Sequence, residues 1–419
     1  MSALRSKRTC RGLSSSSIAD ATGMLMNRFL TILASVFCWA AHGDVQGPLF
    51  VPIPAAVGSP ESGEVFLVDL NNDGHLDLVT KHLLRQRLAV WSGDGKGHFV
   101  PDTEDSMNFD VMPGAVALGD LNNDGVLDLG VSSKAGNQES VRIFLGNRKG
   151  RFDLVAGPPL AAGVSAEGRD YKPVLRFADL DGDGNLDLIS ANGWRNSVEI
   201  FLGDGRGRFS LGSIVKLEQG QWTFSFALGD LDGDGHLDLV TSTPGQPPDS
   251  APGRLEARRG DGKGGFAVAP GQTLPATPDP RVMATVDVNG DGRPDIVLSH
   301  GHTHTLSILL NGGNGVFKNQ HGPPIDVGWV ASELVAVDVN ADKNIDLVAT
   351  AVDSKAPFAS KVVVLLGDGH GGFTPAPGSP FPVGAAAYRL AVGDVNEDGQ
   401  LDIAASSFGS SAVTLLLGQ

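Results

Sequence analysis

The sequence predicts an all-β fold built from seven repeated units, and three observations support this prediction. A nine-residue acidic motif recurs seven times, at spacings of 51 to 59 residues. Glycine-rich turns follow six of the copies, and such turns allow the positive φ of tight hairpins. The sequence after residue 43 shows no convincing helical periodicity. Because each unit contains four short apolar runs, we expect a β-propeller of seven four-stranded antiparallel blades.

The acidic motif stands at the same point of every unit, between the first and second apolar runs. Its copies begin at Asp69, Asp120, Asp179, Asp230, Asp287, Asp338 and Asp394. The third copy reads DLDGDGNLD, and the run LIS follows it. A second motif, such as LGDGRGRF ending at Phe209, introduces the fourth strand of six units with a phenylalanine.

The two ends of the chain predict how the ring closes. The last unit stops at VTLLLGQ and lacks the strand that begins with phenylalanine. The segment GPLFVPIPAA near the N-terminus contains Phe50 and supplies a matching strand. We therefore expect residues 44–419 to form one seven-bladed domain, with an N-terminal strand completing the last blade.

Residues 1–43 are predicted to be a signal peptide with an extended leader. The segment MNRFLTILASVFCWAAHG combines Arg28 with an apolar run from Phe29 to Ala41 and a small residue at Gly43. That run is too short to span a bilayer as a helix, so we expect no transmembrane segment in the mature chain. The protein is predicted to be secreted, either extracellular or periplasmic. Whether translation begins at Met1 or at one of the methionines near residue 25 stays open.

The charge of the chain excludes some partners. The formal net charge is −16, and removal of the leader leaves 27 basic and 47 acidic residues, a net charge of −20. A surface that binds nucleic acid or an anionic membrane needs clustered cations, so neither is expected as a partner. Both cysteines, Cys10 and Cys38, lie in the leader, which leaves no disulfide to stabilise an exported protein. Metal ions are the expected substitute.

Each acidic motif has the chemistry of a site for a hard cation. Carboxylates at positions one, five and nine, with Asp or Asn at position three, supply the oxygen ligands that Ca²⁺ prefers. The first half resembles an EF-hand loop, but the twelfth position of the third copy is Ser190 instead of glutamate, and strands are expected on both sides.

The seven copies together resemble the FG-GAP (VCBS-type) repeat of integrin α-subunit propellers and of many secreted bacterial proteins. The resemblance implies up to seven Ca²⁺ ions, bound by the side chains at positions one, three, five and nine and by the backbone carbonyl at position seven. The implied ligand residues are Asp69, Asn71, Asp73, His75, Asp77, Asp120, Asn122, Asp124, Val126, Asp128, Asp179, Asp181, Asp183, Asn185, Asp187, Asp230, Asp232, Asp234, His236, Asp238, Asp287, Asn289, Asp291, Arg293, Asp295, Asp338, Asn340, Asp342, Asn344, Asp346, Asp394, Asn396, Asp398, Gln400 and Asp402.

The copies are not equivalent. Position three is Asp in the third and fourth copies and Asn in the other five, so those two loops are the most acidic. Lys343 replaces the glycine at position six of the sixth copy. If that position needs a left-handed conformation, lysine costs about 1–2 kcal/mol, and we expect this loop to be the weakest site.

Five aromatic residues are the candidate ligand-binding residues. Tyr171, Trp222, Trp329 and Tyr388 lie before acidic loops, and Trp194 lies in a predicted hairpin, so all five are expected on the face opposite the loops. Aromatic rings beside polar groups can stack on sugars or hold a peptide. The alternative is that they pack between blades.

Two further motifs permit two interpretations each. His300, His302 and His304 alternate along the chain, which fits either a transition-metal site or a polar hairpin tip. The RGD sequence at Arg259 is either an adhesion motif or the glycine-rich turn of blade four, and its register favours the turn.

The resulting functional hypothesis is a calcium-stabilised, monomeric binding or adhesion module for glycans or extracellular, cell-surface proteins. Resemblance to seven-bladed lectins supports it by analogy. The alternative is a polysaccharide-degrading enzyme, a lyase or hydrolase, built on a calcium-bearing propeller. A cationic cluster in a central pocket would favour the enzyme, with Arg169, Lys172, Arg281 and Arg389 as its candidates.

Overall fold

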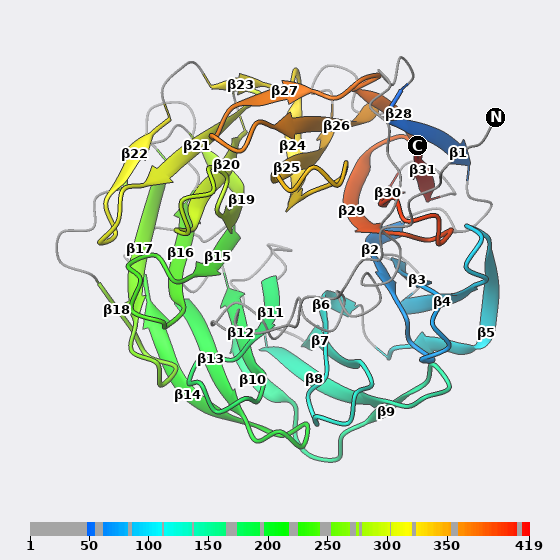
Figure 1. The fold of residues 1–419 in the computed structure, drawn as a ribbon. Helices are drawn as coiled ribbons and strands as arrows, with labels where there is room; N and C mark the ends of the chain where they lie inside the picture. The colour runs from blue at the N-terminus through cyan, green and yellow to red at the C-terminus, as the bar shows by residue number, and fades with distance from the viewer. Residues whose placement is uncertain are drawn as a thin grey trace, which may run out of the picture. The chain divides into compact units, whose positions relative to one another are not determined.

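The fold is that of the computed structural model shown in Figure 1. The structure describes residues 48–54, 62–82, 86–110, 113–135, 138–164, 174–192, 197–217, 225–243, 253–268, 274–275, 279–301, 303–320, 324–352, 359–408 and 413–419. Every regular element in these ranges is a β-strand, and the described chain contains no helix able to cross a bilayer. The predicted signal peptide lies outside the described residues.

The strands form seven antiparallel sheets, each of which is one blade of a β-propeller. Blade one consists of β2 (Ser62–Val68), β3 (Asp77–His82), β4 (Arg87–Gly93) and β5 (Phe99–Asn108). Blade two consists of β6 (Pro113–Gly119), β7 (Asp128–Ala135), β8 (Gln138–Gly146), β9 (Phe152–Leu154) and β10 (Leu160–Val164). Blade three consists of β11 (Val174–Ala178), β12 (Asp187–Asn192), β13 (Ser197–Gly203) and β14 (Phe209–Lys216). Blade four consists of β15 (Ser225–Gly229), β16 (Asp238–Thr243), β17 (Arg254–Gly260) and β18 (Phe266–Val268).

The remaining blades follow the same order. Blade five consists of β19 (Pro280–Val286), β20 (Asp295–His300), β21 (Thr305–Asn311), β22 (Phe317–Asn319) and β23 (Ile325–Asp326). Blade six consists of β24 (Val330–Val337), β25 (Asp346–Val352), β26 (Ser360–Gly367), β27 (Phe373–Pro375) and β28 (Phe381–Val383). Blade seven consists of β29 (Ala387–Gly393), β30 (Asp402–Ser407), β31 (Thr414–Gly418) and β1 (Phe50–Pro54). In blades two, five and six the outer strand is split, because two short segments pair with the third strand.

The N-terminal strand completes the last blade, as predicted. β1 pairs with β31 in an antiparallel register that places Phe50 opposite Gly418. In blade three the corresponding pair is Phe209 with Gly203, so β1 occupies the position of a fourth strand. Phe50 is fully buried and meets the ring of Phe381 edge to face, with centroids 5.6 Å apart. The pairing of β1 with β31 closes the ring.

The hydrophobic core is divided into seven clusters, and each lies between two consecutive blades. One cluster joins Ile189 and Ile200 of blade three to Phe226 and Leu239 of blade four. The cluster between blades seven and one, which includes Leu415 and Leu78, closes the series. Alternate residues of a strand face the two neighbouring blades. The apolar side chains of every blade are therefore buried against both neighbours.

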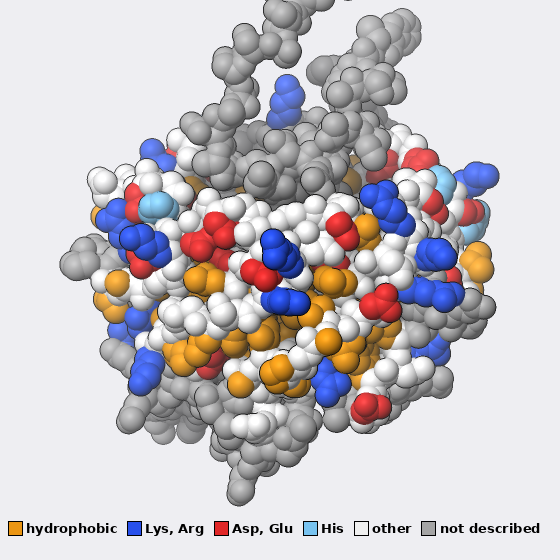
Figure 2. All heavy atoms as spheres, turned by 90° about the horizontal axis from the view of Figure 1, so that it is seen from below, with side chains coloured by type: hydrophobic (Ala, Val, Ile, Leu, Met, Phe, Trp, Pro, Cys, Tyr) orange, Lys and Arg blue, Asp and Glu red, His pale blue; other side chains and the backbone are white. Residues whose placement is uncertain are grey.

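The outer strands leave some apolar side chains in solvent. Figure 2 shows hydrophobic side chains gathered below interspersed positive and negative charges on one side of the molecule. On strands β9 and β14, Leu154, Leu211 and Ile214 are exposed.

Candidate metal loops

Each acidic loop connects the innermost strand of a blade to the second strand. Position two is a leucine or valine that is buried in the core, as Leu180 is in blade three. This buried side chain anchors the loop to the hydrophobic core. The polar side chains of the loop lie at one end of the blade, where the glycine-rich turn between the third and fourth strands packs beside them: Gly205, in that turn of blade three, approaches Asn185 of the acidic loop.

The aspartate at position nine fixes the loop to the sheet. In blade three, Asp187 accepts the Leu180 N–H at 2.8 Å on one oxygen and the Gly203 N–H at 2.8 Å on the other. All seven copies make this pair of bonds with donor–acceptor distances of 2.7–3.1 Å. All seven carboxylates are at most 1% exposed. The position-nine aspartate is thus part of the scaffold as well as a candidate ligand.

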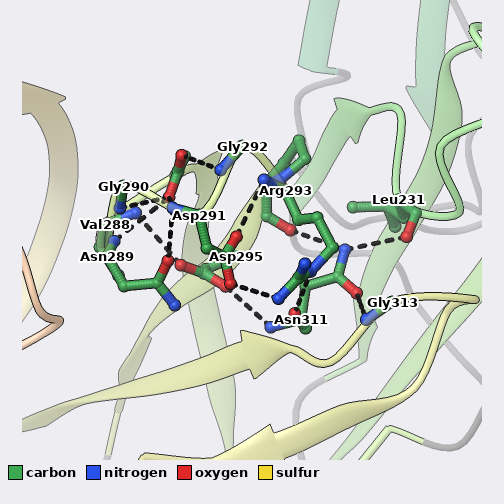
Figure 3. A network of polar contacts seen from close by, with 12 residues as sticks. Leu231, Val288, Asn289, Gly290, Asp291, Gly292, Arg293, Asp295, Asn311 and Gly313 are labelled. Carbon is green, nitrogen blue, oxygen red and sulfur yellow. Dashed lines mark hydrogen bonds and ion pairs between the residues drawn. The ribbon is translucent and has the colours of Figure 1, made fainter.

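The glycine that donates to this aspartate is required by close packing. A Cβ on Gly203 would lie 2.3 Å from the carbonyl oxygen of Leu186, and the same contact recurs in five other blades. Blade five is the exception, because Asn311 stands there. Its amide donates to the carbonyl of Leu231 in blade four at 2.8 Å, as Figure 3 shows. The same amide donates to the carbonyl of Pro294 at 3.1 Å.

Positions four and six both adopt the left-handed conformation. Position six has φ between +75° and +95° in all seven loops, as predicted from its glycine, and Lys343 has φ +75°. Position four has φ between +57° and +82°, which was not predicted because glycine, asparagine, alanine and glutamate all occur there. Loop six places both Ala341 and Lys343 in this region, so its backbone is the most strained of the seven.

The carboxylates at positions one and five accept hydrogen bonds from backbone N–H groups of their own loop. In blade three, Asp179 accepts the Gly182 and Gly184 N–H groups at 2.8 and 2.9 Å. Asp183 accepts the Asn185 N–H at 2.8 Å. Backbone donors thus orient the carboxylates, and each oxygen keeps a lone pair for a further partner.

The electrostatics of the loops favour the binding of a cation. Burial, together with two nearby carboxylates from positions one, three and five of the loop, raises the pKa of each position-nine aspartate to about 6. Burial and the charges of Asp183 and Asp179 also raise the pKa of Asp181. Two hydrogen bonds from N–H groups are therefore not enough to offset the desolvation of the position-nine carboxylates.

Two loops hold a triad of carboxylates at metal-binding distance. In blade three the triad is Asp179, Asp181 and Asp187, and in blade four Asp230, Asp232 and Asp238. One oxygen of each residue lies within 4.8 Å of the other two. Oxygens that share a Ca²⁺ at about 2.4 Å are separated by up to about 4.8 Å, so the triads fit this ion. In the other five loops asparagine takes the third position.

Arginines partly neutralise the loops of blades four and five. Arg259 extends from the end of β17 and contacts Asp232 at 3.0 Å and Asp234 at 2.6 Å. Burial acts to raise the pKa of Asp234, but the hydrogen bond and charge of Arg259 outweigh it, and the net pKa is lowered. In blade five, Arg293 at position seven contacts Asp291 at 2.5 Å, as Figure 3 shows. The arginine of the RGD sequence therefore lies against the acidic loop of its own blade.

Two of the five candidate ligand-binding aromatics lie among the described residues. Trp329 packs against the core between blades five and six, and Lys361 lies 4.6 Å from its ring centroid. Tyr388 is 40% exposed and stacks against Arg389, whose guanidinium carbon is 4.6 Å from the ring centroid. Tyr171, Trp194 and Trp222 lie outside the described residues.

The other candidate residues are occupied by structural contacts. His300 ends β20, is buried, and pairs with the Ser307 hydroxyl at 2.7 Å. Gly301 and Thr303 lie in the turn after it, so His304 does not continue the strand that ends at His300. Arg281 pairs with Asp279 at 3.2 Å, and Arg389 pairs with Glu333. Arg169, Lys172 and His302 lie outside the described residues.

The fold and the loops define a β-propeller with an acidic loop on every blade. The FG-GAP-like repeat family matches residues 69–131, 179–241, 287–349 and 338–405, and the FG-GAP repeat matches residues 222–264. These matches cover more than half of the chain, which therefore belongs to the FG-GAP-like repeat family.

Solved structures share the fold at low sequence identity. One is an Agrocybe aegerita lectin that recognises non-reducing terminal N-acetylglucosamine. The two chains are 20% identical, with a TM-score of 0.53 over 84% of this chain and 87% of the lectin. Another is BBS1N in complex with ARL6DN, at 13% identity and a TM-score of 0.55 over 89% and 98% of the two chains. A comparison with curated proteins found no match.

Proposed function

We propose that the acidic loops bind Ca²⁺ and that the ions stabilise an exported binding module. The observation that carries the calcium proposal is the repeated position-nine aspartate, buried beside further carboxylates in every blade. The residues that would hold the ion are those at positions one, three, five and nine, with the position-seven carbonyl. A divalent cation would compensate charges that the loop alone leaves unbalanced. Calcium sites of extracellular modules work at the high Ca²⁺ concentration outside cells, which suits the predicted signal peptide.

The ligand is proposed to be a glycan or an extracellular protein. Two features support a binding module: membership of the FG-GAP-like family, and a fold shared with a lectin that recognises N-acetylglucosamine. The half-exposed ring of Tyr388 offers an aromatic surface beside a cation. Aromatic rings with adjacent polar groups suit the apolar face and the hydroxyls of a sugar.

A glycan array tests this proposal. The calcium-loaded protein should bind a defined set of glycans, and prior removal of Ca²⁺ should abolish binding because the blades lose their order. Tyr388→Ala should weaken binding, whereas Leu154→Ala on the outer strand β9 serves as an exposed control. Absence of binding to every glycan would contradict the glycan proposal.

A further inference from the structure

Charged side chains of the innermost strands stand at two levels, five and three positions before the acidic loops. In strands whose register is regular there, such as β11 and β24, residues five and three positions before the acidic loop lie on the same side, because side chains alternate along a strand. The intervening residues, such as Leu175 and Phe226, are buried in the cores between blades. Figure 1 shows these strands, among them β2, β11, β24 and β29, around the centre.

At the first level, five positions before the loops, the charges are paired. Arg389 of β29 forms an ion pair with Glu333 of β24, and Glu64 of β2 contributes to the field at Arg389. Glu64 in turn pairs with the buried Lys81 at 2.8 Å. Two cations and two carboxylates from blades six, seven and one therefore compensate one another.

At the second level, three positions before the loops, one charge is not paired in this way. Arg176 of β11 is exposed, and it makes no hydrogen bond or ion pair with any residue that the structure describes. Its guanidinium carbon lies 5.9 Å from the ring centroid of Phe226. The residues equivalent to Arg176 in the other blades are apolar and mostly small: Ala117, Ala227, Ala284, Ala391, Phe66 and Val335. Arg176 is therefore the charged residue at a position that is apolar in the other six blades.

Charges from blades on the other side of the ring act on Arg176. Desolvation by the surrounding protein lowers its pKa, and the charges of Glu333 and Arg389, in blades six and seven, also act on it. Among the described residues, Arg176 thus supplies an uncompensated positive charge at the centre of an acidic protein.

We propose that Arg176 binds a carboxylate of the ligand, so that the ligand class is an acidic saccharide such as a polyuronate. This inference rests on the proposed glycan-binding function and adds the charge of the sugar. A guanidinium binds a carboxylate through two parallel hydrogen bonds. One cation that no described carboxylate pairs with matches the single negative charge of a uronate carboxylate.

The test compares a polyuronate oligosaccharide with a neutral glucan oligosaccharide of the same length, by calorimetric titration of the calcium-loaded protein. The polyuronate should bind at least about tenfold more tightly, and Arg176→Gln should remove this preference. Arg176→Lys should keep part of it. Arg142→Gln, at an exposed arginine of β8, is the matched control and should change nothing. Thermal melting of each variant checks that it folds.

Each outcome separates this inference from the proposed function. Neutral and acidic oligosaccharides that bind equally well, or a polyuronate preference that survives Arg176→Gln, overturn the role of Arg176 and leave a glycan-binding module in place. If no glycan binds, the proposed glycan-binding function fails. Acetate binding then tests whether Arg176 binds a carboxylate. Acetate binding that disappears in Arg176→Gln supports the carboxylate site. Failure of the wild type to bind acetate, or competition by inorganic sulfate as strong as that by acetate, overturns it.

Discussion

The acidic loops of blades three and four differ at one position in nine, yet their charges are balanced differently. Position seven is Asn185 in one and His236 in the other. The larger difference comes from the end of the third strand, where blade three has Leu202 and blade four has Arg259. Arg259 contacts two carboxylates of its loop, whereas the carboxylates of blade three have no cationic side chain within ion-pair distance among the described residues.

This difference shows that the acidic motif alone does not determine the properties of a site. The pKa of Asp181 is raised by burial and by its acidic neighbours, which marks uncompensated negative charge. The pKa of Asp234 is lowered overall, because Arg259 supplies part of the positive charge that an ion would bring. We therefore expect the loop of blade three to bind Ca²⁺ more tightly than the loop of blade four.

The largest expected effect tests what the two loops share. Asp187→Ala and Asp238→Ala should each lower the free energy of unfolding by about 2–4 kcal/mol without metal, because two buried N–H groups lose their acceptor. Urea denaturation measures both, with Asp204→Ala in an exposed turn as the control. Losses that differ by more than about 1 kcal/mol would show that the scaffolds of the two loops differ as well.

The next prediction concerns a variant that gives blade four the leucine found at the same place in blade three. Arg259→Leu should raise the calcium affinity of blade four about tenfold, or about 1.4 kcal/mol, because the ion no longer competes with a guanidinium. Calcium titration calorimetry should then detect one more tight site than in the wild type. Arg142→Leu is the control for loss of an exposed arginine. An unchanged titration would contradict the comparison.

The pH dependence separates the metal-free and calcium-loaded states of both loops. The folded pKa of about 6 at Asp187 and Asp238 lies above the usual value near 4, so the folded state holds more protons than the unfolded state between these values. The stability of the metal-free protein should therefore fall as pH rises from about 4 to about 6, and bound Ca²⁺ should reverse this trend by favouring the ionised carboxylates. Urea denaturation in metal-depleted and calcium-containing buffers across this range measures both slopes. Equal slopes in the two buffers would contradict the placement of the ions at these aspartates.

The smallest expected effect concerns backbone strain. Gly184 of blade three has φ +85°, and no described atom lies within 4 Å of the position that a Cβ would take there. Lys343 holds the same position of loop six at φ +75°. Lys343→Gly should stabilise the protein by about 1 kcal/mol, and Gly184→Lys should destabilise it by a similar amount. Thermal melting measures both changes. A loss of stability in Lys343→Gly would mean that the lysine side chain contributes more than its backbone conformation costs.

The sequence predicted the parts of the fold that depend on local patterns. Repeated loops, glycine turns and alternating apolar runs indicated the seven blades, and the unmatched Phe50 strand indicated the closure of the ring. The contact between Arg259 and Asp234 was not predictable, because it joins side chains 25 residues apart and depends on the geometry of neighbouring strands. The left-handed conformation at position four was also missed, since Ala341 and Glu397 give no signal of it.

Less of the candidate ligand site than of the acidic loops was predicted from the sequence. Tyr388 was identified from its position before a loop, and it is half-exposed. Arg176 was overlooked although the aligned repeats carry a signal, because it is the charged residue at a position that is apolar in the other six blades. Only the ring brings it into electrostatic range of Glu333 and Arg389.

The central claim, that Ca²⁺ ions hold the seven blades in order, is tested most directly by thermal unfolding of the wild-type protein with and without the ion. Each site stabilises the folded state by about 2.7 kcal/mol when free Ca²⁺ is a hundredfold above its dissociation constant. We predict that chelation lowers the melting temperature sharply and that Ca²⁺, added back in excess of the chelator, restores it. A melting temperature that is the same with Ca²⁺ and with chelator would contradict the claim.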